Sequence, residues 1–355
     1  MKLALITDTH YGIRGDSAVM LDHQKTFFEN IFFPTILEED ITHIVHLGDL
    51  VDRRKYINFN TLSRMKTDFL DKLVENNITM DIILGNHDVF YKSTNSLNAL
   101  TELLGSYKDY INVIDSPTET DYGICIPWIN AENEKNIEKS IKKTKQQILF
   151  GHLELKGFEM FRGQICDHGQ NIKIFDKFDM VFSGHFHHKS HKENIYYLGA
   201  PYQMTWSDHG CDRGFYIFET DNRELQFIPN PYSMFTRITY NDAGATDATE
   251  SLEYLDSEQH KITNAYIKII VQTKDNPYWF DQFVTKIESF KPIDIRIIES
   301  IEFNEDNSYF VDETQDTRTI LLNTIDKLDI TTDKTKLKKL MSSLYTEALN
   351  IEVDA

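Results

Sequence analysis

Over residues 1–230, short apolar runs rich in β-branched side chains alternate with longer stretches whose apolar residues recur at helical spacing. This rhythm is typical of an α/β domain, in which strands pair in a sheet and helices cover it. Helices are predicted at 60–75, at 98–104 and, as a Lys-rich solvent-facing segment, at 132–146. The five predicted strands that matter most lie at 3–7, 43–47, 80–84, 147–150 and 179–183.

A domain boundary is predicted at Pro229 to Pro231, because two prolines so close together stop regular structure. Beyond it, strands at 265–272 and 293–300 enclose a helix at 278–290 and form a β-α-β unit. The stretches 242–258 and 299–316 contain acidic but no basic residues and are predicted to be solvated loops. Two stretches with apolar residues at helical spacing follow, at 320–328 and 337–349.

The chain is therefore expected to have three parts. These are a main domain at 1–230, a small second domain at 231–304, and an acidic linker with a helical pair at 305–355. The last stripe of that pair consists of Leu337, Leu340, Met341 and Leu344, beside four lysines.

Each of the five strands ends in a short polar motif. Because ligands bind outside the carboxyl ends of strands in an α/β sheet, these motifs are expected to meet in one crevice. Glycine at four of the turns allows a sharp bend and a close approach of the backbone. The motifs are Asp8-Thr9-His10, Gly48-Asp49-Leu50-Val51-Asp52-Arg53, Gly85-Asn86-His87-Asp88, Gly151-His152 and Gly184-His185-Phe186-His187.

Carboxylates, imidazoles and an amide oxygen, without a thiolate, suit divalent manganese, iron or zinc better than calcium. Two such ions about 3.5 to 4 Å apart bind both the attacking and the leaving oxygen of a phosphoryl centre. The crevice therefore predicts phosphoester hydrolysis. Each motif alone is more often a cap or a turn, and the other histidines are interpreted as surface or satisfied core residues, but five such motifs in one order have no comparable structural explanation.

These motifs, in this order, resemble those of the calcineurin-like metallophosphoesterase superfamily, over most of residues 1–230. Within it the chain is most similar to the SbcD-type repair nucleases, and especially to recombination endonuclease subunits of tailed phages. Further similarities are Ile126-Pro127-Trp128, Gly199-Ala200-Pro201, Asp212-Arg213-Gly214-Phe215, the β-α-β unit and the final helical pair. The resemblance implies a metallophosphoesterase β-sandwich flanked by helices, a small capping domain and a C-terminal helical pair.

The resemblance also implies two manganese ions per subunit, with magnesium, iron or zinc as alternatives. One ion would be held by Asp8, His10, Asp49 and His187, and the other by Asp49, Asn86, His152 and His185, so that Asp49 bridges them. His87 would then stabilise or protonate the leaving oxygen, as a residue next to a ligand yet free to face the substrate.

One position departs from the nuclease pattern. Asp52 stands where many cellular members have a second histidine, and the motif from Gly48 to Arg53 is the one that phosphoprotein phosphatases have. By that resemblance, Asp52 would orient His87, and Arg53 or Arg54 would contact the substrate. The second domain and the helical pair nevertheless favour the nuclease interpretation.

The family resemblance further implies partners. The second domain would contact DNA, and the terminal helices, through Leu337, Leu340, Met341 and Leu344, would bind the coiled-coil base of an SbcC-type ABC ATPase. The alternative is that these helices pack on their own domain. A homodimer would form through the helices after the second and third motifs, although packing of the same faces on the sheet explains them equally well.

Composition restricts the remaining possibilities. The formal net charge of −19, from 37 Lys plus Arg and 56 Asp plus Glu, argues against a general polyanion-coating role. No run approaches the roughly 20 apolar residues of a membrane span, and the start of the chain does not resemble a targeting signal. Three cysteines without paired spacing favour a reducing compartment, the cytoplasm of a bacterium, including one infected by a phage.

Three functions remain open at this stage. The leading one is a DNA nuclease, exonuclease on duplex ends and endonuclease on single strands, that acts with an ATPase in recombination, replication and break repair. The second is a phosphoprotein phosphatase or small phosphodiester hydrolase. The third is a non-catalytic adaptor of the ATPase, against which the complete set of seven ligand positions argues.

Overall fold

The structure is a computed structural model that describes residues 1–161, 164–299, 322, 325 and 333–350. Contacts within the chain divide it into two compact units, Met1–Ile301 and Glu302–Ala355. The three predicted parts remain a proposal, and each of the two units is described by itself.

The first sheet carries the strands that hold three of the five predicted motifs. Its strand order is β14-β13-β1-β2-β3-β4, with β1 to β4 parallel and β13 antiparallel to both of its neighbours. Strand β13 pairs with β1 although it follows much later in the chain. The strands are β1 (Lys2–Ile6), β2 (His43–His46), β3 (Thr79–Ile83), β4 (Ile111–Ile114), β13 (Gly214–Glu219) and β14 (Glu224–Pro229).

The second sheet holds the other two motifs. Its order is β11-β12-β10-β7-β6-β5, with a parallel centre from β12 to β6. A short antiparallel hairpin, β8 (Glu159–Phe161) and β9 (Gln164–Ile165), follows β7. The strands of the sheet are β5 (Thr118–Glu119), β6 (Ile124–Ile126), β7 (Ile148–His152), β10 (Met180–Gly184), β11 (Ser190–Lys192) and β12 (Ile195–Tyr197).

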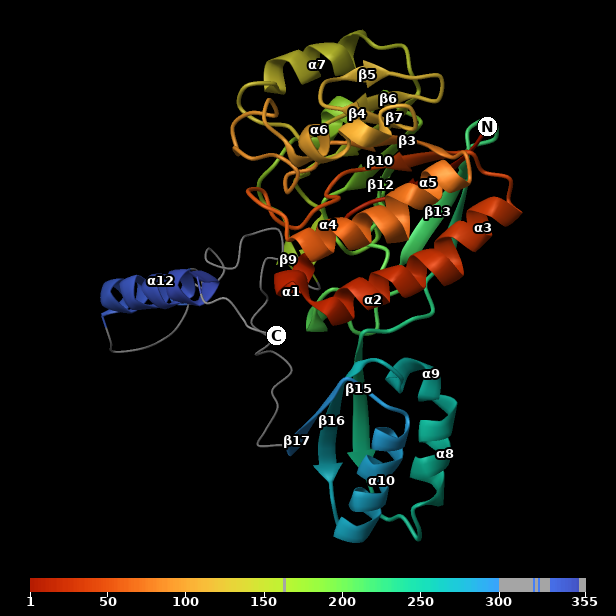
Figure 1. The fold of residues 1–355 in the computed structure, drawn as a ribbon, viewed down its shortest axis with the longest axis vertical. Coiled ribbons are helices and arrows are strands. Elements are labelled where there is room, and N and C mark those ends of the chain that lie inside the picture. Colours follow the sequence, from red (N-terminus) through yellow and green to blue (C-terminus); the bar gives the residue numbers. More distant parts are fainter. Residues whose placement is uncertain (162–163, 300–321, 323–324, 326–332, 351–355) are drawn as a thin grey trace. The chain divides into compact units, whose positions relative to one another are not determined.

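The two sheets pack face to face because successive side chains of a strand point to opposite faces. In β1, Leu3 and Leu5 belong to the core between the sheets, whereas Ala4 and Ile6 belong to the core under the helices. Figure 1 shows α2, α3, α4 and α5 along the first sheet, and α7 packs on the outer face of the second through Ile137. The predicted sandwich of two sheets flanked by helices is thereby confirmed.

The helices predicted within residues 1–230 are present, with one refinement. The segment 60–75 forms α4 (Phe59–Met65) and α5 (Asp71–Glu75), joined by a π-helical turn at Lys66–Leu70. Its apolar face, including Met65 and Phe69, is fully buried in the core. The other helices of this region are α1 (Ile13–Asp16), α2 (Ala18–Phe27), α3 (Phe33–Glu38), α6 (Ala99–Leu103) and α7 (Glu134–Lys143).

A third sheet lies beyond the Pro229 to Pro231 boundary. It has three parallel strands, β15 (Phe235–Asn241), β16 (Tyr266–Thr273) and β17 (Asp294–Glu299). Helix α10 (Pro277–Ser289) connects β16 to β17, which confirms the predicted β-α-β unit. Strand β15 and the crossover that follows it were not predicted.

The prediction of a solvated loop at 242–258 is wrong. This stretch contains α8 (Thr249–Ser257), which precedes α9 (Gln259–Ile262). The helix forms because Leu255 is fully buried in the core of the small domain, while Glu250, Glu253 and Asp256 face solvent. An acidic surface is therefore compatible with a packed helix here.

In the second unit the structure describes α12 (Lys334–Asn350), which includes the stripe from Leu337 to Leu344. Most of the other predicted stripe, at 320–328, and the acidic stretch after Glu299 lie outside the described residues. Among the residues that are described, no helix is long and apolar enough to cross a membrane. Cys125, Cys166 and Cys211, which all lie within the described residues, form no disulfide.

Candidate metal centre

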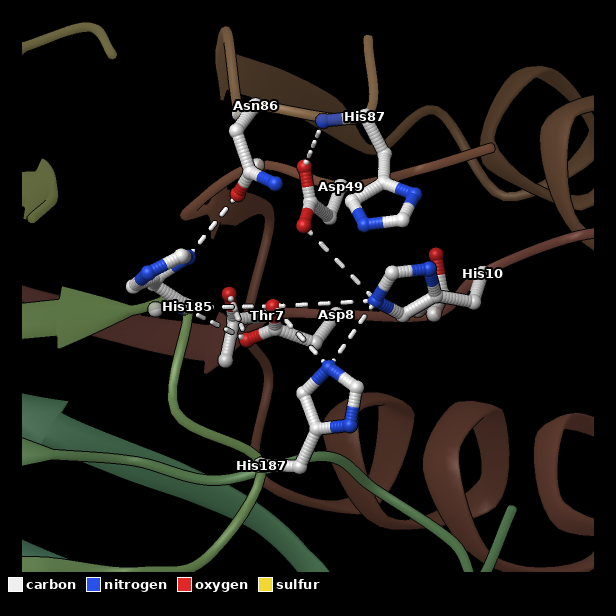
Figure 2. A network of polar contacts seen from close by, with 12 residues as sticks. Thr7, Asp8, His10, Asp49, Asn86, His87, His185 and His187 are labelled. Atoms are coloured by element: carbon white, nitrogen blue, oxygen red, sulfur yellow. Dashed lines mark hydrogen bonds and ion pairs between the residues drawn. The ribbon is translucent and has the colours of Figure 1, made fainter. Parts of the chain in front are cut away.

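The carboxyl ends of β1, β2 and β3 meet those of β7 and β10, so that the five predicted motifs lie together. All seven predicted ligands are at most 6 % exposed. Figure 2 shows most of them with their side chains directed toward a common space. The ligands are Asp8, His10, Asp49 and Asn86 from the first sheet and His152, His185 and His187 from the second.

The first cluster consists of Asp8, His10 and His187, whose ligand atoms lie within 4.8 Å of one another. The Nε2 atoms of His10 and His187 are 3.1 Å apart. Nε2 of His10 is 3.9 Å from Oδ1 of Asp8 and 3.7 Å from Oδ2 of Asp49. Figure 2 marks these contacts.

The second cluster consists of Asp49, His152 and His185 within the same limit, with Asn86 between the two histidines. Oδ1 of Asn86 is 2.9 Å from Nε2 of His152 and 2.8 Å from Nδ1 of His185. Oδ2 of Asp49 is 3.3 Å from Nε2 of His152. Asp49 thus contacts both clusters, which is the position predicted for a bridging ligand.

The spacing of these atoms fits metal ions. Donor atoms that share an ion at about 2.1 Å are about 3.0 to 3.4 Å apart in octahedral or tetrahedral arrangements. Nδ1 of His152 is 2.7 Å from the carbonyl oxygen of Leu47 and must donate to it, so Nε2, which faces Asp49 and Asn86, is the nitrogen that would bind an ion. Metal-binding histidines are typically oriented in this way, by a hydrogen bond from the ring nitrogen that does not bind the metal.

The charges in the cluster also fit cations. Burial lowers the pKa of His152, but Asp49 and Asp8 more than offset it and raise the pKa to about 9. His10 behaves in the same way: burial lowers its pKa, but Asp52, Asp49 and Asp8 outweigh this and raise the pKa to about 9. The carboxylates therefore hold protons on these rings, and an incoming cation would replace them.

The backbone of the centre is strained. Asp8, His10, Asp49 and His185 have φ values of 52°, 43°, 56° and 91°, in the left-handed region that residues other than glycine rarely adopt. Such conformations are typical of functional sites, where the surrounding structure maintains them. Here the amides of Asp8 and His10 donate to the carbonyls of Gly48 and Asp49, which ties the β1 loop to the β2 loop.

Asp88 is a functional residue that sequence reasoning missed. Its buried carboxylate accepts four backbone N–H groups, from Asp49 (2.8 Å), Leu50 (3.0 Å), Val51 (3.3 Å) and Gly85 (2.9 Å). It therefore fixes the β2 loop against the β3 loop and sets the direction of Asp49. Its only sequence signal is the last position of the motif Gly85-Asn86-His87-Asp88.

Two glycines allow the loops to approach each other. A Cβ atom on Gly85 would lie 2.1 Å from Oδ1 of Asp49, and one on Gly184 would lie 2.1 Å from Oγ1 of Thr7. The threonine hydroxyl in turn donates to Oδ2 of Asp8 at 2.8 Å. Only glycine fits at these two turns.

His87 lies beside the first cluster and is only half-buried, unlike the ligands. Its Nδ1 is 2.6 Å from the backbone carbonyl oxygen of Asp52, so this nitrogen donates and Nε2 is left to face a substrate. The side chain of Asp52 lies elsewhere, with Oδ1 3.5 Å from Nδ1 of His10. The expected orientation of His87 by Asp52 thus comes from its carbonyl, and its carboxylate supports a predicted metal ligand.

Arg53 and Arg54, the arginines predicted to contact the substrate, have other contacts in the structure. Arg53 forms an ion pair with Asp16 at 2.5 Å and lies over the ring of Tyr56. Arg54, its neighbour, is half-buried. The charge of Arg53 is therefore already engaged by Asp16.

Over residues 1–189 the chain matches the family model for calcineurin-like phosphoesterases, and it belongs to that family. This protein is accordingly a metal-dependent phosphodiesterase. Exonuclease subunit 1 of Enterobacteria phage T4 is 31 % identical to it over 358 residues, which cover 98 % of this chain and 99 % of the phage protein.

Two solved structures show a weaker likeness. An archaeal phosphodiesterase is 14 % identical, with a TM-score of 0.35. The match covers 65 % of this chain and 100 % of the archaeal chain. The nuclease MPE of Pseudomonas putida matches with 14 % identity, 64 % of this chain, 87 % of its own and a TM-score of 0.30. Neither carries weight for the assignment.

Proposed function

We propose that this chain is a manganese-dependent DNA nuclease, exonuclease on duplex ends and endonuclease on single-stranded DNA, in the bacterial cytoplasm. The observation that supports it most is the convergence of seven buried ligand residues into two clusters that share Asp49. The phage relative that matches nearly the whole chain is named an exonuclease subunit. Recombination, replication and break repair are the processes in which we expect it to act.

In this proposal Asp8, His10, Asp49 and His187 hold one ion, and Asp49, Asn86, His152 and His185 the other. Two bound ions would supply an activated hydroxide and neutralise the charge of the phosphate. The protein's own contribution is orientation: Asp88 fixes Asp49, and the Leu47 carbonyl fixes His152.

His87 is the proposed acid or hydrogen-bond donor for the leaving oxygen. The Asp52 carbonyl holds its Nδ1, so the ring can exchange a proton with the substrate only at Nε2. The residue is half-buried, and its ring lies edge-on to that of the predicted ligand His10, with 4.8 Å between the ring centroids.

The test is incubation of the purified chain with linear duplex DNA and circular single-stranded DNA in manganese. We expect both substrates to be cut and His87→Ala to lower the rate by about 10²- to 10⁴-fold. The matched control is His191→Ala, which removes an exposed histidine of β11 and is expected to act like wild type. Equal cutting by wild type and His87→Ala, or no cutting by wild type, refutes the proposal.

A phosphoprotein phosphatase is the second candidate, favoured by the motif that ends in Asp52 and Arg53. Rapid turnover of phosphoserine peptides with inert DNA would establish it. The ion pair of Arg53 with Asp16 makes this arginine a poor phosphate ligand, so we expect Arg53→Ala to leave manganese-dependent DNA cutting within a few-fold of wild type.

We propose that the second domain contacts the DNA backbone through a row of cations. Arg237, Lys268 and Arg296 are register partners on adjacent strands of the third sheet, and all three lie on the face opposite the helix-covered core. Like charges directly opposite each other destabilise a sheet, and a polyanion would relieve this repulsion. Burial, Arg237 and Arg296 lower the pKa of Lys268.

The cation row is tested by the salt dependence of DNA binding, since each phosphate contact contributes about 0.9 to the slope of log K against log salt. Arg237→Gln with Arg296→Gln is expected to reduce that slope by about 2. The control, Lys261→Gln with Lys286→Gln, removes two cations from the helices of the same domain. Equal slopes for the two double variants contradict the contact.

We further propose that α12 docks on the coiled coil of an SbcC-type ABC ATPase. Leu337, Leu340, Met341 and Leu344 follow helical spacing, and Leu340 and Leu344 are 56 % and 48 % exposed. A chain truncated after Asn304, and the double variant Leu340→Glu with Leu344→Glu, are expected to lose the ATPase in a pull-down. Thr335→Glu on the same helix is the control, and undiminished binding by the truncated chain refutes the docking.

A homodimer is proposed through the loops that follow β2 and β3. The faces predicted for it carry Leu62, Met65, Phe69, Leu97 and Leu100. Met65, Phe69 and Leu100 are buried in the core and Leu62 is partly buried against it, whereas Leu97 is 38 % exposed. Near these faces in sequence, Phe59 is 88 % exposed, and Tyr56 and Tyr91 are also exposed. Phe59→Ser is expected to shift the chain to monomer in analytical ultracentrifugation. The control is Tyr278→Ser, which removes an aromatic side chain of α10 that is 67 % exposed.

A further inference from the structure

Glu154 lies just beyond the second cluster, two residues after the ligand His152. Strand β7 ends at His152, and an isolated β-bridge pairs Leu155 with Gln170 one residue after Glu154. The residues on either side of Glu154 are both held by hydrogen bonds: Ser183 Oγ accepts from the amide of Leu153 at 3.0 Å, and the hydroxyl of Tyr197 accepts from the amide of Leu155 at 3.1 Å. The backbone therefore fixes the direction in which the Glu154 side chain points.

The carboxylate of Glu154 lies between two histidines. Its Oε1 is 3.7 Å from Nε2 of His185 and 3.2 Å from Nε2 of His168, in the segment that follows the β8–β9 hairpin. The opposite nitrogen of His185, Nδ1, is 2.8 Å from Oδ1 of Asn86 in the second cluster. The His185 ring thus has the cluster on one side and the Glu154 carboxylate on the other.

This arrangement bears on which nitrogen of His185 binds an ion. In the structure Nδ1 donates to Oδ1 of Asn86, and the Glu154 carboxylate lies 3.7 Å from Nε2, beyond hydrogen-bond distance. Its negative charge favours a proton on Nε2, so that an ion would take the place of the proton on Nδ1. A carboxylate behind a metal-binding histidine fixes the ring and makes it a stronger ligand. His168, through the same oxygen of Glu154, holds the carboxylate in place.

We propose that Glu154 is a positioning residue that prepares His185 for the second ion, and that His168 anchors it. The inference rests on the proposed two-ion assignment of the centre. The inference concerns only the second ion, because His185 is a proposed ligand of that ion and not of the first.

The test is a calorimetric titration of the ion-free full-length chain with manganese. Wild type is expected to bind two ions. In Glu154→Gln, which keeps the shape of the side chain but removes its charge, one affinity is expected to fall by about 10- to 100-fold while the other stays within about twofold. His168→Gln is expected to weaken the same ion by less, and Glu159→Gln, an exposed change of equal charge in the hairpin, to weaken neither.

Thermal unfolding in chelator separates positioning from a structural role. If Glu154 only stabilises the fold, Glu154→Gln lowers the ion-free midpoint and leaves both manganese affinities unchanged, which overturns the inference. If Glu154→Ala does not fold, Glu154→Gln and His168→Gln still decide. A wild-type chain that binds two ions but does not cut DNA refutes the nuclease, whereas the affinities of Glu154→Gln still decide the role of Glu154.

Discussion

Asp88 offers the sharpest test of how the centre is built. Oδ2 of its carboxylate accepts from the amides of Asp49 and Gly85, and Oδ1 from those of Leu50 and Val51. Asparagine keeps one acceptor oxygen and puts an amino group, which is a donor, in place of the other. Two of the four buried N–H groups therefore lose their acceptor in Asp88→Asn.

Each hydrogen bond to a charged group contributes about 1.5 to 3 kcal/mol, so Asp88→Asn is expected to lower the free energy of unfolding by about 3 to 6 kcal/mol. That is a large share of the roughly 5 to 15 kcal/mol that stabilises a typical domain. Urea unfolding in chelator measures it, because no ion then contributes. The control is Asp115→Asn, an exposed change of equal charge. A loss below about 1 kcal/mol would show that the loops do not depend on this carboxylate.

Three further predictions concern packing, pH and DNA affinity. Gly85→Ala is expected to displace Asp49 and abolish manganese binding by calorimetry, whereas Gly105→Ala, with no atom within 4 Å of its new Cβ, is expected to bind normally. Burial raises the pKa of Asp81, but hydrogen bonds from three neighbouring side chains outweigh it and hold the pKa below its ordinary value. Its contribution to stability is therefore present above about pH 4 and lost as pH falls further, so the urea midpoint of Asp81→Asn is expected to depend less on pH in that acid range. Because the net charge is −19, the isolated chain is expected to bind DNA weakly and only with manganese; tight binding in chelator, measured by fluorescence anisotropy, contradicts this.

The five strand ends were predictable because two independent patterns coincide at each. Buried β-branched runs mark the strands, and ligand-type side chains, with glycine at four of the five turns, follow directly. Parallel strands then bring the tips together whatever the details of the loops. For this reason the positions of Asp49, His152 and His187 follow from local sequence and topology alone.

Residues that act through distant partners were not predictable. Asp88 and Glu154 look like ordinary acidic residues until loops far apart in the chain meet them. The engagement of Arg53 likewise depends on Asp16, which lies on another loop. Helix α8 was missed because its charge pattern suggested solvent, while a single buried face around Leu255 is enough to dock it.

The pairing of β1 with β13, and the spread of the ligands from Asp8 to His187, bear on how the protein is made. At about 5 to 20 residues per second, roughly 10 to 40 s separate the synthesis of the first ligand from that of the last. Until then the nascent chain has neither complete cluster, and β1 lacks its antiparallel neighbour for longer still. A fragment released early would therefore carry several of the strand-end motifs but no assembled centre. Activity would appear only in chains whose two sheets have both formed.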